Sequence, residues 1–513
     1  MALSEDFVGW VRGTLSNSKL LPSIAALTIA YYMAVVVYRL TFHPLSRYPG
    51  LRVAAVTDLW WAYARTTGRY PWIIEDALKQ HDIYLAQDKN LELFVQVGYD
   101  ALDTGDGGIS GETGPVRHRA IAKKLAPAFS MRNPKAREAT ILKHVDLFIQ
   151  RMREVGVRGN GVELQRWSDW LALDLSADMT YGRDMGQVRD MKGSVLLSAT
   201  LKLNLFITMS EVTRKFRLLS PLMYLTIPPS VWLLMPKLIR MNTEDVKTRI
   251  ERRGQTDRLD YFEQLIPAHQ PVPQDRKHIY HLENVAGQLL LASWQPLADQ
   301  FYSLIFFLLG SPDAYATLVD EVRTAFATSD SMNTESTATL KYLQACQRES
   351  LRLHKATVDG LPRVSPGAVL DGKYIPKEVG YFIAPVYLSA LEEFIYNISY
   401  FAAARSRRYF TDPLSFRPER WLSPDHPRFD PTFKGDNLVA SKPFSQGPRG
   451  CPGGPIAMAV VRLFIAKFLW HIDLEAAPGF GDLSFEKDFK WLTFWERPPF
   501  WVRLKATRTA AMA

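Results

Sequence analysis

Residues 443–455 hold the strongest candidate for chemistry in this chain, because Cys451 lies there in a stretch crowded with glycine and proline. Glycines let a backbone approach a partner more closely than a Cβ would allow, and prolines stiffen the same few residues. Such a loop can present a thiol to a bulky group, and a metal-bound thiol is deprotonated. An apolar helical pattern starts at residue 456, so backbone N–H groups are expected near the sulfur. A buried, inert cysteine is the ordinary alternative.

The spacing Phe444-x-x-Gly447-x-Arg449-x-Cys451-x-Gly453 resembles the haem-binding loop of the cytochrome P450 family. The resemblance implies that Cys451 is the axial thiolate ligand of a haem iron, the haem being haem b. It also implies that Phe444 and Arg449 belong to the cofactor site, with Arg449 facing an acidic group of the ligand. Five fixed residues at this spacing form a far more specific signal than an isolated pair of glycines.

A second motif, Glu349-x-x-Arg352, places an acid and a base on one face of an expected helix, because residues three apart are neighbours there. Most such pairs are surface ion pairs worth less than about 1 kcal/mol. The family resemblance implies instead a buried pair completed by Arg420, and this trio would form a structural brace for the loop that carries Cys451.

Further cofactor-binding residues follow only from the resemblance. His118 fits the first of two positions that hold the haem propionates on one helix, but Ala122 stands where an arginine is expected. Either Lys123 or Lys124 is the substitute or the propionate is less well held, and Arg363, at the entry of a strand, is a second candidate. Without the resemblance, a histidine and two lysines on a helix predict an ordinary solvated face.

Residues 283–309 predict a long central helix that is apolar on nearly every side and therefore buried. The family usually places an acid followed by threonine midway along it, to carry protons to iron-bound oxygen, whereas this chain has Gln295 and Pro296. Because proline has no N–H, the carbonyl of Ala292 loses its partner, and a kink is expected. The freed carbonyl can hold a water that Gln295 orients, although an amide does not act as the usual proton donor.

Three groups remain open as the substitute donor: Ser293, Asp299 or a hydroxyl of the substrate. For Asp299 a solvated charge or a structural cap is the more ordinary interpretation. The catalytic candidates on this helix are thus Gln295, Pro296 and Ser293, and they form an atypical set.

Composition limits the classes of protein. Among 513 residues, 47% are hydrophobic and 22% are charged, which is ordinary globular composition. Two cysteines exclude a disulfide scaffold and fit a reducing compartment. The net charge of +9 favours an anionic membrane or an acidic protein partner. No charge run or basic–aromatic interleaving is present, so nucleic acid is not an expected partner.

Residues 20–38 contain no charged side chain and would reach roughly 28 Å as a helix, close to the thickness of a bilayer. A cleaved signal peptide is the rival interpretation, but no clear small-residue cleavage site precedes the basic segment. We therefore expect an N-terminal segment, 1–42, with a single-span anchor. The proline-containing residues 43–50 resemble the hinge of fungal family members, and residues 51–513 would form the catalytic domain. The resemblance to microsomal members implies an endoplasmic reticulum location with that domain in the cytosol.

The remaining pattern is coarse. Residues 105–114 predict a mobile loop over the substrate. Residues 192–240 are unusually apolar, which fits more core, whereas the family resemblance implies roof helices that contact substrate and touch the membrane. The resemblance breaks at about 386–399, where the chain has either a real insertion or a retained intron, with a glycosylation sequon at Asn397. The expected helices are 72–81, 142–155, 167–179, 312–326 and 340–353, and the expected strands are 83–86 and 91–97.

The resemblance extends from residue 43 to about 503 and implies a mainly α fold with a small β-rich lobe, the cytochrome P450 fold, preceded by a transmembrane helix. It implies a monooxygenase that hydroxylates or epoxidises an apolar small molecule, typical of fungal secondary metabolite biosynthesis, with electrons from NADPH–cytochrome P450 reductase. One alternative is a haem-thiolate enzyme that rearranges or dehydrates its substrate without activating O2. A non-catalytic haem- or lipid-binding membrane protein is the other.

Overall fold

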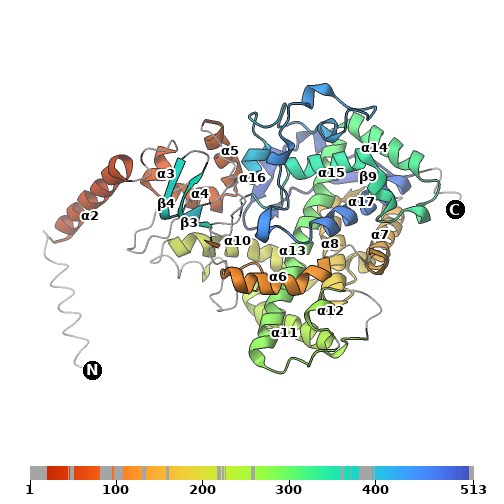
Figure 1. Cartoon of the computed structure of the whole chain (residues 1–513), viewed down its shortest axis with the longest axis horizontal. Coiled ribbons are helices and arrows are strands. Elements are labelled where there is room, and N and C mark those ends of the chain that lie inside the picture. The colour runs from red at the N-terminus through yellow and green to blue at the C-terminus, as the bar shows by residue number, and fades with distance from the viewer. Residues whose placement is uncertain are drawn as a thin grey trace.

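The computed structural model describes residues 20–43, 46, 51–80, 95–96, 108–129, 134–156, 161–215, 221, 224–225, 227–255, 260–267, 269–358, 360, 363–370, 373–380, 395–396 and 399–507. These residues form a mostly helical body with small sheets, and the apolar helix α2 projects from it near the N-terminus (Figure 1). The expected fold class is therefore confirmed. Expectations for 83–86, for the sequon at Asn397 and for most of 386–399 lie outside the described residues.

The α-helices are α2 (Leu20–Val37), α3 (Arg52–Val56), α4 (Leu59–Thr66), α5 (Tyr70–Gln80), α6 (Pro115–Phe129), α7 (Pro134–Gly156), α8 (Leu164–Tyr181), α9 (Gln187–Asp190), α10 (Val195–Lys215), α11 (Pro229–Glu251), α12 (Phe262–Leu265), α13 (Arg276–Leu309), α14 (Pro312–Ala325), α15 (Lys341–Leu353), α16 (Tyr400–Ala404), α17 (Gly454–His471) and α18 (Phe485–Asp488). The π-helical turn η1 (Tyr38–Phe42) extends α2, and 3-10 turns include η6 (Pro418–Trp421) and η9 (Gly447–Arg449). The strands are β1 (Val95–Gln96), β2 (Val162–Glu163), β3 (Arg363–Leu370), β4 (Lys373–Gly380), β5 (Ile395–Tyr396), β6 (Ile472–Ala476), β7 (Lys490–Trp491), β8 (Trp495–Glu496) and β9 (Trp501–Ala506).

Helix α13 crosses the middle of the body and packs along α8, with α15 and α17 also against it (Figure 1). It begins at Asp275, whose side chain accepts a hydrogen bond from the backbone N–H of His278 at 3.2 Å, a typical N-cap. Its side chains are buried on most sides, as expected for a helix that is apolar all round. The helix runs through Pro296 without ending there.

Three small antiparallel sheets flank the helices. In the first, β3 pairs with β4 as a hairpin, and β1 and β5 both pair with β3. The second has the order β2-β9-β6, so the C-terminal strand β9 lies between two earlier strands. Strands β7 and β8 form the third, a two-stranded pair opposite Gly68 of the α4–α5 turn. The hairpin β3–β4 lies beside α3 and α4, at the end of the body from which α2 projects (Figure 1).

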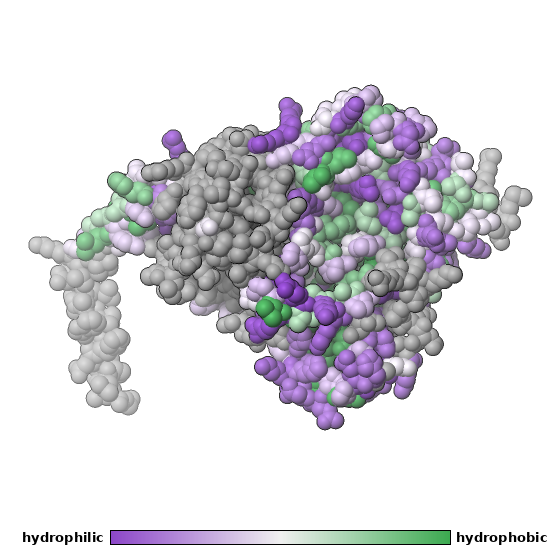
Figure 2. All heavy atoms as spheres, viewed as in Figure 1, coloured by the Kyte–Doolittle hydropathy of each residue, from purple (hydrophilic) through white to green (hydrophobic). Residues whose placement is uncertain are grey.

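Helix α2 exposes large apolar side chains, which a globular protein in water would cover. Leu27 is 72% exposed, and green apolar residues are visible along this arm in Figure 2. The stretch Ala25–Phe42 is long and apolar enough to cross a membrane and has no residue buried against the body. By length and composition Val195–Thr213 and Gly454–His471 also qualify, but 67% of the second is buried inside the fold. The N-terminal helix is thus the candidate anchor.

The apolar region 192–240 forms α10, most of α11 and part of the turn between them. Some of its side chains are buried, as the core interpretation expects, and others are exposed, while contact of this region with a membrane stays a prediction. Val231 is fully buried, whereas Leu225 and Leu233 are 81% and 83% exposed. Pro236 lies inside α11 on the exposed side of the helix.

Candidate functional site

The loop before α17 holds Cys451 in a fixed position by its own backbone. The N–H of Cys451 donates to the carbonyl of Phe444 at 2.8 Å, and the N–H of Gly450 donates to the carbonyl of Gly447 at 2.9 Å. Gly447 has a φ of +75°, a left-handed conformation that favours glycine, so the turn depends on this residue. A Cβ at Gly454 would lie 3.1 Å from the Phe444 ring, so glycine there lets the ring pack on the start of α17.

Cys451 is exposed as a residue, and its loop is exposed or partly buried, while its sulfur is partly screened by neighbouring groups. Burial raises the pKa of this thiol, while hydrogen bonds from the backbone N–H groups of Gly453 and Gly454 oppose the rise. Those amides belong to the start of α17, where the helix leaves N–H groups unpaired. Among the described residues no three His, Cys, Asp or Glu side chains come together as a metal site.

Three further predicted cofactor residues lie on two elements, α6 and β3. His118 is buried near the start of α6, and this end of the helix lies near the cysteine loop, because Arg449 bonds the carbonyls of Glu112 and Thr113 just before it. Lys123 is exposed, so it does not share the buried face of His118. Arg363 opens β3 opposite Gln96. The structure brings His118 into the neighbourhood of the loop, and the roles of these residues remain predictions.

Arg449 is engaged with the chain itself. Its Nη1 donates to the carbonyl of Glu112 at 2.6 Å, and its Nη2 lies 3.4 Å from the carbonyl of Thr113. The same segment is held from the other side, since Oε1 of Gln288 on α13 accepts from the N–H of Ile109 at 2.9 Å. The described part of the predicted loop, residues 108–114, is therefore tied to both the cysteine loop and the central helix.

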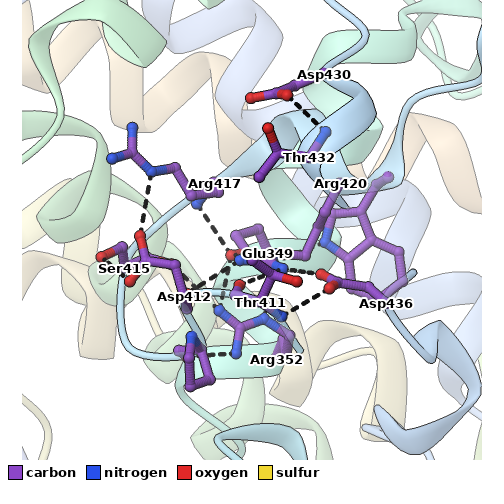
Figure 3. Close-up of polar contacts among 12 residues, drawn as sticks. Glu349, Arg352, Thr411, Asp412, Ser415, Arg417, Arg420, Asp430, Thr432 and Asp436 are labelled. Atoms are coloured by element: carbon purple, nitrogen blue, oxygen red, sulfur yellow. Dashed lines mark hydrogen bonds and ion pairs between the residues drawn. The ribbon is translucent and has the colours of Figure 1, made fainter. Parts of the chain in front are cut away.

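Glu349, Arg352 and Arg420 lie together in the interior, and each is at most 4% exposed. Arg352 donates to both carboxylate oxygens of Glu349 at 2.8 Å, and Nε of Arg420 donates to Oε1 at 3.0 Å. The indole N–H of Trp421 and the backbone N–H of Arg417 complete the set at 2.9 and 3.0 Å. Figure 3 shows the carboxylate of Glu349 at the centre of these donors. Burial opposes ionisation, but the two arginines outweigh it and lower the pKa of Glu349.

The two arginines also tie the surrounding chain together. Nη1 of Arg352 donates to the carbonyls of Ala404 and Pro413 at 2.7 and 2.6 Å. Arg420 donates to the carbonyl of Thr411 at 3.0 Å and pairs with Asp436. Asp436 precedes the segment that leads into the cysteine loop, so the trio fixes the base of that segment (Figure 3).

On the central helix, the few accessible positions form a stripe. Gln288, Ala292 and Pro296 are spaced by one turn and are all partly or fully exposed, within a helix that is otherwise mostly buried. Because Pro296 has no N–H to donate, the carbonyl of Ala292 lies at this accessible stripe without its helical partner. The hydroxyl of Ser293 donates back to the carbonyl of Leu289 at 2.6 Å, so it is occupied within the helix.

Gln295 lies on the neighbouring, buried face of α13 and contacts Asp299 one turn later. Its Nε2 donates to Oδ2 of Asp299 at 2.7 Å, and the two residues are 4% and 1% exposed. The interpretation of Asp299 as a solvated charge or a helix cap is therefore wrong, because the residue is buried inside the helix. The amide of Gln295 is therefore paired with a carboxyl group in this structure.

Two charged residues that the sequence analysis did not select complete this cluster. Nη2 of Arg497 donates to Oδ1 of Asp169 on α8 at 2.7 Å, and its Nε lies 3.3 Å from Oδ1 of Asp299. Burial, together with the charge of Asp169, raises the pKa of Asp299 to about 8 against the opposing effects of Arg497 and Gln295. The sequence contained a sign that Asp169 has a partner, because an acid within an apolar helix requires a buried group to compensate its charge. No local pattern marks Arg497.

Known proteins resemble this chain in sequence and in fold. The cytochrome P450 family model matches residues 71–494. The cytochrome P450 monooxygenase TwmD of Talaromyces wortmannii is 40% identical over 490 residues, covering 91% of this chain and 93% of that protein. The cytochrome P450 monooxygenase btcC of Colletotrichum orbiculare is 30% identical over 515 residues, covering 96% and 95%. A crystal structure of the cytochrome P450DA heme domain shares the fold, with a TM-score of 0.62 and 17% identity, over 82% of this chain and 85% of that chain.

Proposed function

This chain belongs to the cytochrome P450 family, and we propose that it is a membrane-anchored haem-thiolate monooxygenase in which Cys451 binds the iron. One observation carries the proposal: an exposed cysteine stands at the end of a hydrogen-bonded loop, next to the amides that start α17. When bound, the haem supplies the activation of O2. This chain's own residues then position the cofactor and the substrate.

Several side chains would hold the haem. Cys451 would bind its iron, and Phe444 would pack beside it where the loop meets α17. His118, Arg363, Arg449 and Lys123 are the candidates for its carboxylate groups. Glu349, Arg352 and Arg420 act at a distance, because they fix the segments from which the cysteine loop extends. The cofactor in question is haem b.

The redox partner and the location form the second half of the proposal. P450 monooxygenases use a redox partner, and we infer that here it is the NADPH–cytochrome P450 reductase of the endoplasmic reticulum. The net charge of +9 favours docking of an acidic protein surface. The anchor would span residues 20–38 and the hinge 43–50, with the catalytic domain, 51–513, in the cytosol. The substrate would be an apolar small molecule of fungal secondary metabolism, in keeping with the fungal relatives.

Replacing Cys451 by alanine is expected to abolish the thiolate-type absorption band of the reduced, carbon monoxide-bound protein. The reason is that Cys451 supplies the sulfur ligand on which that band depends. Cys346→Ala is the matched control. Cys346 is fully buried, so this variant should show the same band as the wild type. A thiolate-type band that survives in Cys451→Ala contradicts the assignment.

Oxygenation is tested separately, with NADPH, the reductase, a library of apolar substrates and isotope-labelled O2. Oxygen label in the product supports a monooxygenase. Conversion of the substrate without incorporation of label supports the alternative of a rearrangement, which the atypical Gln295–Pro296 pair suggests.

Deletion of residues 1–42 is expected to remove the resistance of the protein to extraction from membranes by alkaline carbonate. The reason is that the stretch Ala25–Phe42 has no residue buried inside the fold and exposes large apolar side chains. Fractionation of cells that express the full and shortened chains measures the effect. A shortened chain that still resists carbonate would show that another segment, such as the apolar α10, inserts into the bilayer.

A further inference from the structure

The cluster behind the central helix contains an unequal number of charges. Asp169 on α8 and Asp299 on α13 face a single guanidinium, that of Arg497. All three residues are at most 5% exposed. Within the described part of the chain, neither carboxyl group has a second cation within ion-pair distance. The cluster would therefore carry one net negative charge if both acids were ionised.

The groups around this cluster do not compensate its excess negative charge. The ring of Tyr302 lies 5.5 Å from the Arg497 guanidinium, and burial raises the pKa of its phenol, so it stays neutral. His354 also lies near Arg497, and burial together with Arg497 and Arg405 lowers its pKa to about 3. Gln295 is an amide and carries no charge. An isolated buried charge is unfavourable in free energy, so the state of lower free energy is one in which the two acids share one proton.

Geometry indicates which acid holds the proton. Arg497 donates to Asp169 at 2.7 Å but reaches Asp299 only at 3.3 Å, so Asp169 is the better-compensated carboxylate. Within Asp299, Oδ1 faces the cation, whereas Oδ2 faces Gln295. A proton is therefore expected on Oδ2. Burial raises the pKa of both acids, against the opposing charge of Arg497, and raises that of Asp299 to about 8, as expected for two carboxyl groups that share one cation.

The proton has a consequence for Gln295. An ionised Asp299 would accept from Nε2, which is the orientation of the amide at the 2.7 Å contact, and no described residue then donates to the amide carbonyl oxygen of Gln295. A protonated Oδ2 is a donor, which is matched by the amide carbonyl rather than by its N–H. Rotation of the amide about its last bond then turns Nε2 outward, beside the break at Pro296.

We propose that Asp169, Arg497 and Asp299 form a buried triad that binds one exchangeable proton, and that this proton decides whether Gln295 presents a donor or an acceptor beside Pro296. The inference rests on the proposed function and deepens it, because an outward amide N–H is a hydrogen-bond donor where an acid is absent from the helix. Asp299 and Arg497 are then positioning residues that act through Gln295.

Infrared difference spectra of the purified full-length protein test the triad by counting carboxylic acid groups. The wild type is expected to show a D2O-sensitive acid band at pH 7 that is absent from the two aspartate variants of the triad and disappears as the pH rises through about 8. Asp299→Asn and Asp169→Asn should each remove it, because one remaining carboxylate is balanced by Arg497. Arg497→Met should add a second band, since neither acid then has a cation.

Asp178→Asn is the matched control on the same helix as Asp169. Lys143 and His144 outweigh burial and lower the pKa of Asp178 to about 2, so this variant should leave the band unchanged. A wild type without the band at pH 7, or a band that persists in both Asp299→Asn and Asp169→Asn, would overturn the triad. If a variant does not fold, the pH titration of the wild type labelled with 13C-aspartate gives the same decision.

A functional measurement tests the link to Gln295. The fraction of NADPH electrons that ends in product should fall several-fold in the wild type as the pH rises through about 8, because Asp299 loses its proton. In Asp299→Asn and in Gln295→Leu the fraction should not depend on pH in this range. A wild-type profile that persists in both variants overturns the link. Failure of the haem-thiolate assignment is distinguishable, because it appears in the carbon monoxide spectrum and leaves the infrared count unaffected.

Discussion

Glu349→Gln is expected to lower the free energy of unfolding by about 3–5 kcal/mol and to leave little protein that retains haem. The substitution keeps the shape of the side chain but removes the charge that compensates Arg352 and Arg420. Both arginines are at most 4% exposed, so neither can turn its charge to solvent. Because a folded domain is stable by only about 5–15 kcal/mol, this loss is a large share of the total. Thermal unfolding and haem content of the purified variant measure the effect.

Glu475→Gln is the matched control for this experiment. Glu475 also pairs with a cation, Lys505, but the two side chains are 48% and 63% exposed. Exposed pairs contribute at most about 1 kcal/mol, so this variant should unfold close to the wild-type temperature. Equal stability and haem content in the two variants would show that Glu349 does not brace the cysteine loop.

The cysteine side of the site was largely predictable from the sequence, because its residues are linked by short, local spacings. The turn around Cys451 contains glycines, which adopt backbone conformations that other residues avoid, and Gly447 has a positive φ. Glu349 and Arg352 are three residues apart on one helix, so their contact follows from helical geometry alone. Arg420 required the family resemblance, since no local rule brings it to Glu349.

The opposite side was less predictable because its contacts join distant segments. Gln295 and Asp299 are four residues apart, so their hydrogen bond follows from helical spacing once the helix is known to be buried. Arg497 reaches them from the C-terminal segment between β8 and β9, and Asp169 from α8. Composition and periodicity carry no information on such a pairing. The expectation that Asp299 was solvated failed for this reason.

Arg449 illustrates a further limit. The motif predicts an arginine at this position and implies that it meets an acidic group of the ligand. In the structure its guanidinium holds the carbonyls of Glu112 and Thr113 instead. A guanidinium has five N–H donors, so these contacts leave room for a ligand, but they also give Arg449 a second role in fixing residues 108–114. A motif indicates the role of a residue but not how many groups its side chain contacts.

Pro296→Ala is expected to stabilise the protein while impairing its chemistry. Alanine restores an N–H that can donate to the carbonyl of Ala292, and a proline inside a helix costs about 3 kcal/mol relative to alanine. The greater freedom of the unfolded chain offsets about 0.4–1 kcal/mol of that gain, so a net increase of about 2 kcal/mol is expected. Thermal unfolding measures the gain, and the yield of product per NADPH measures the loss.

Pro236→Ala separates the two effects, because Pro236 also lies inside a helix but on the exposed side of α11. It should give a similar stabilisation and an unchanged product yield. The loss expected for Pro296→Ala comes from Ala292, whose carbonyl would then be consumed by the helix instead of remaining free at the accessible stripe. If both variants keep the wild-type product yield, the free carbonyl has no part in the reaction, and the proline is tolerated only because the rest of α13 is held by its packing against α8.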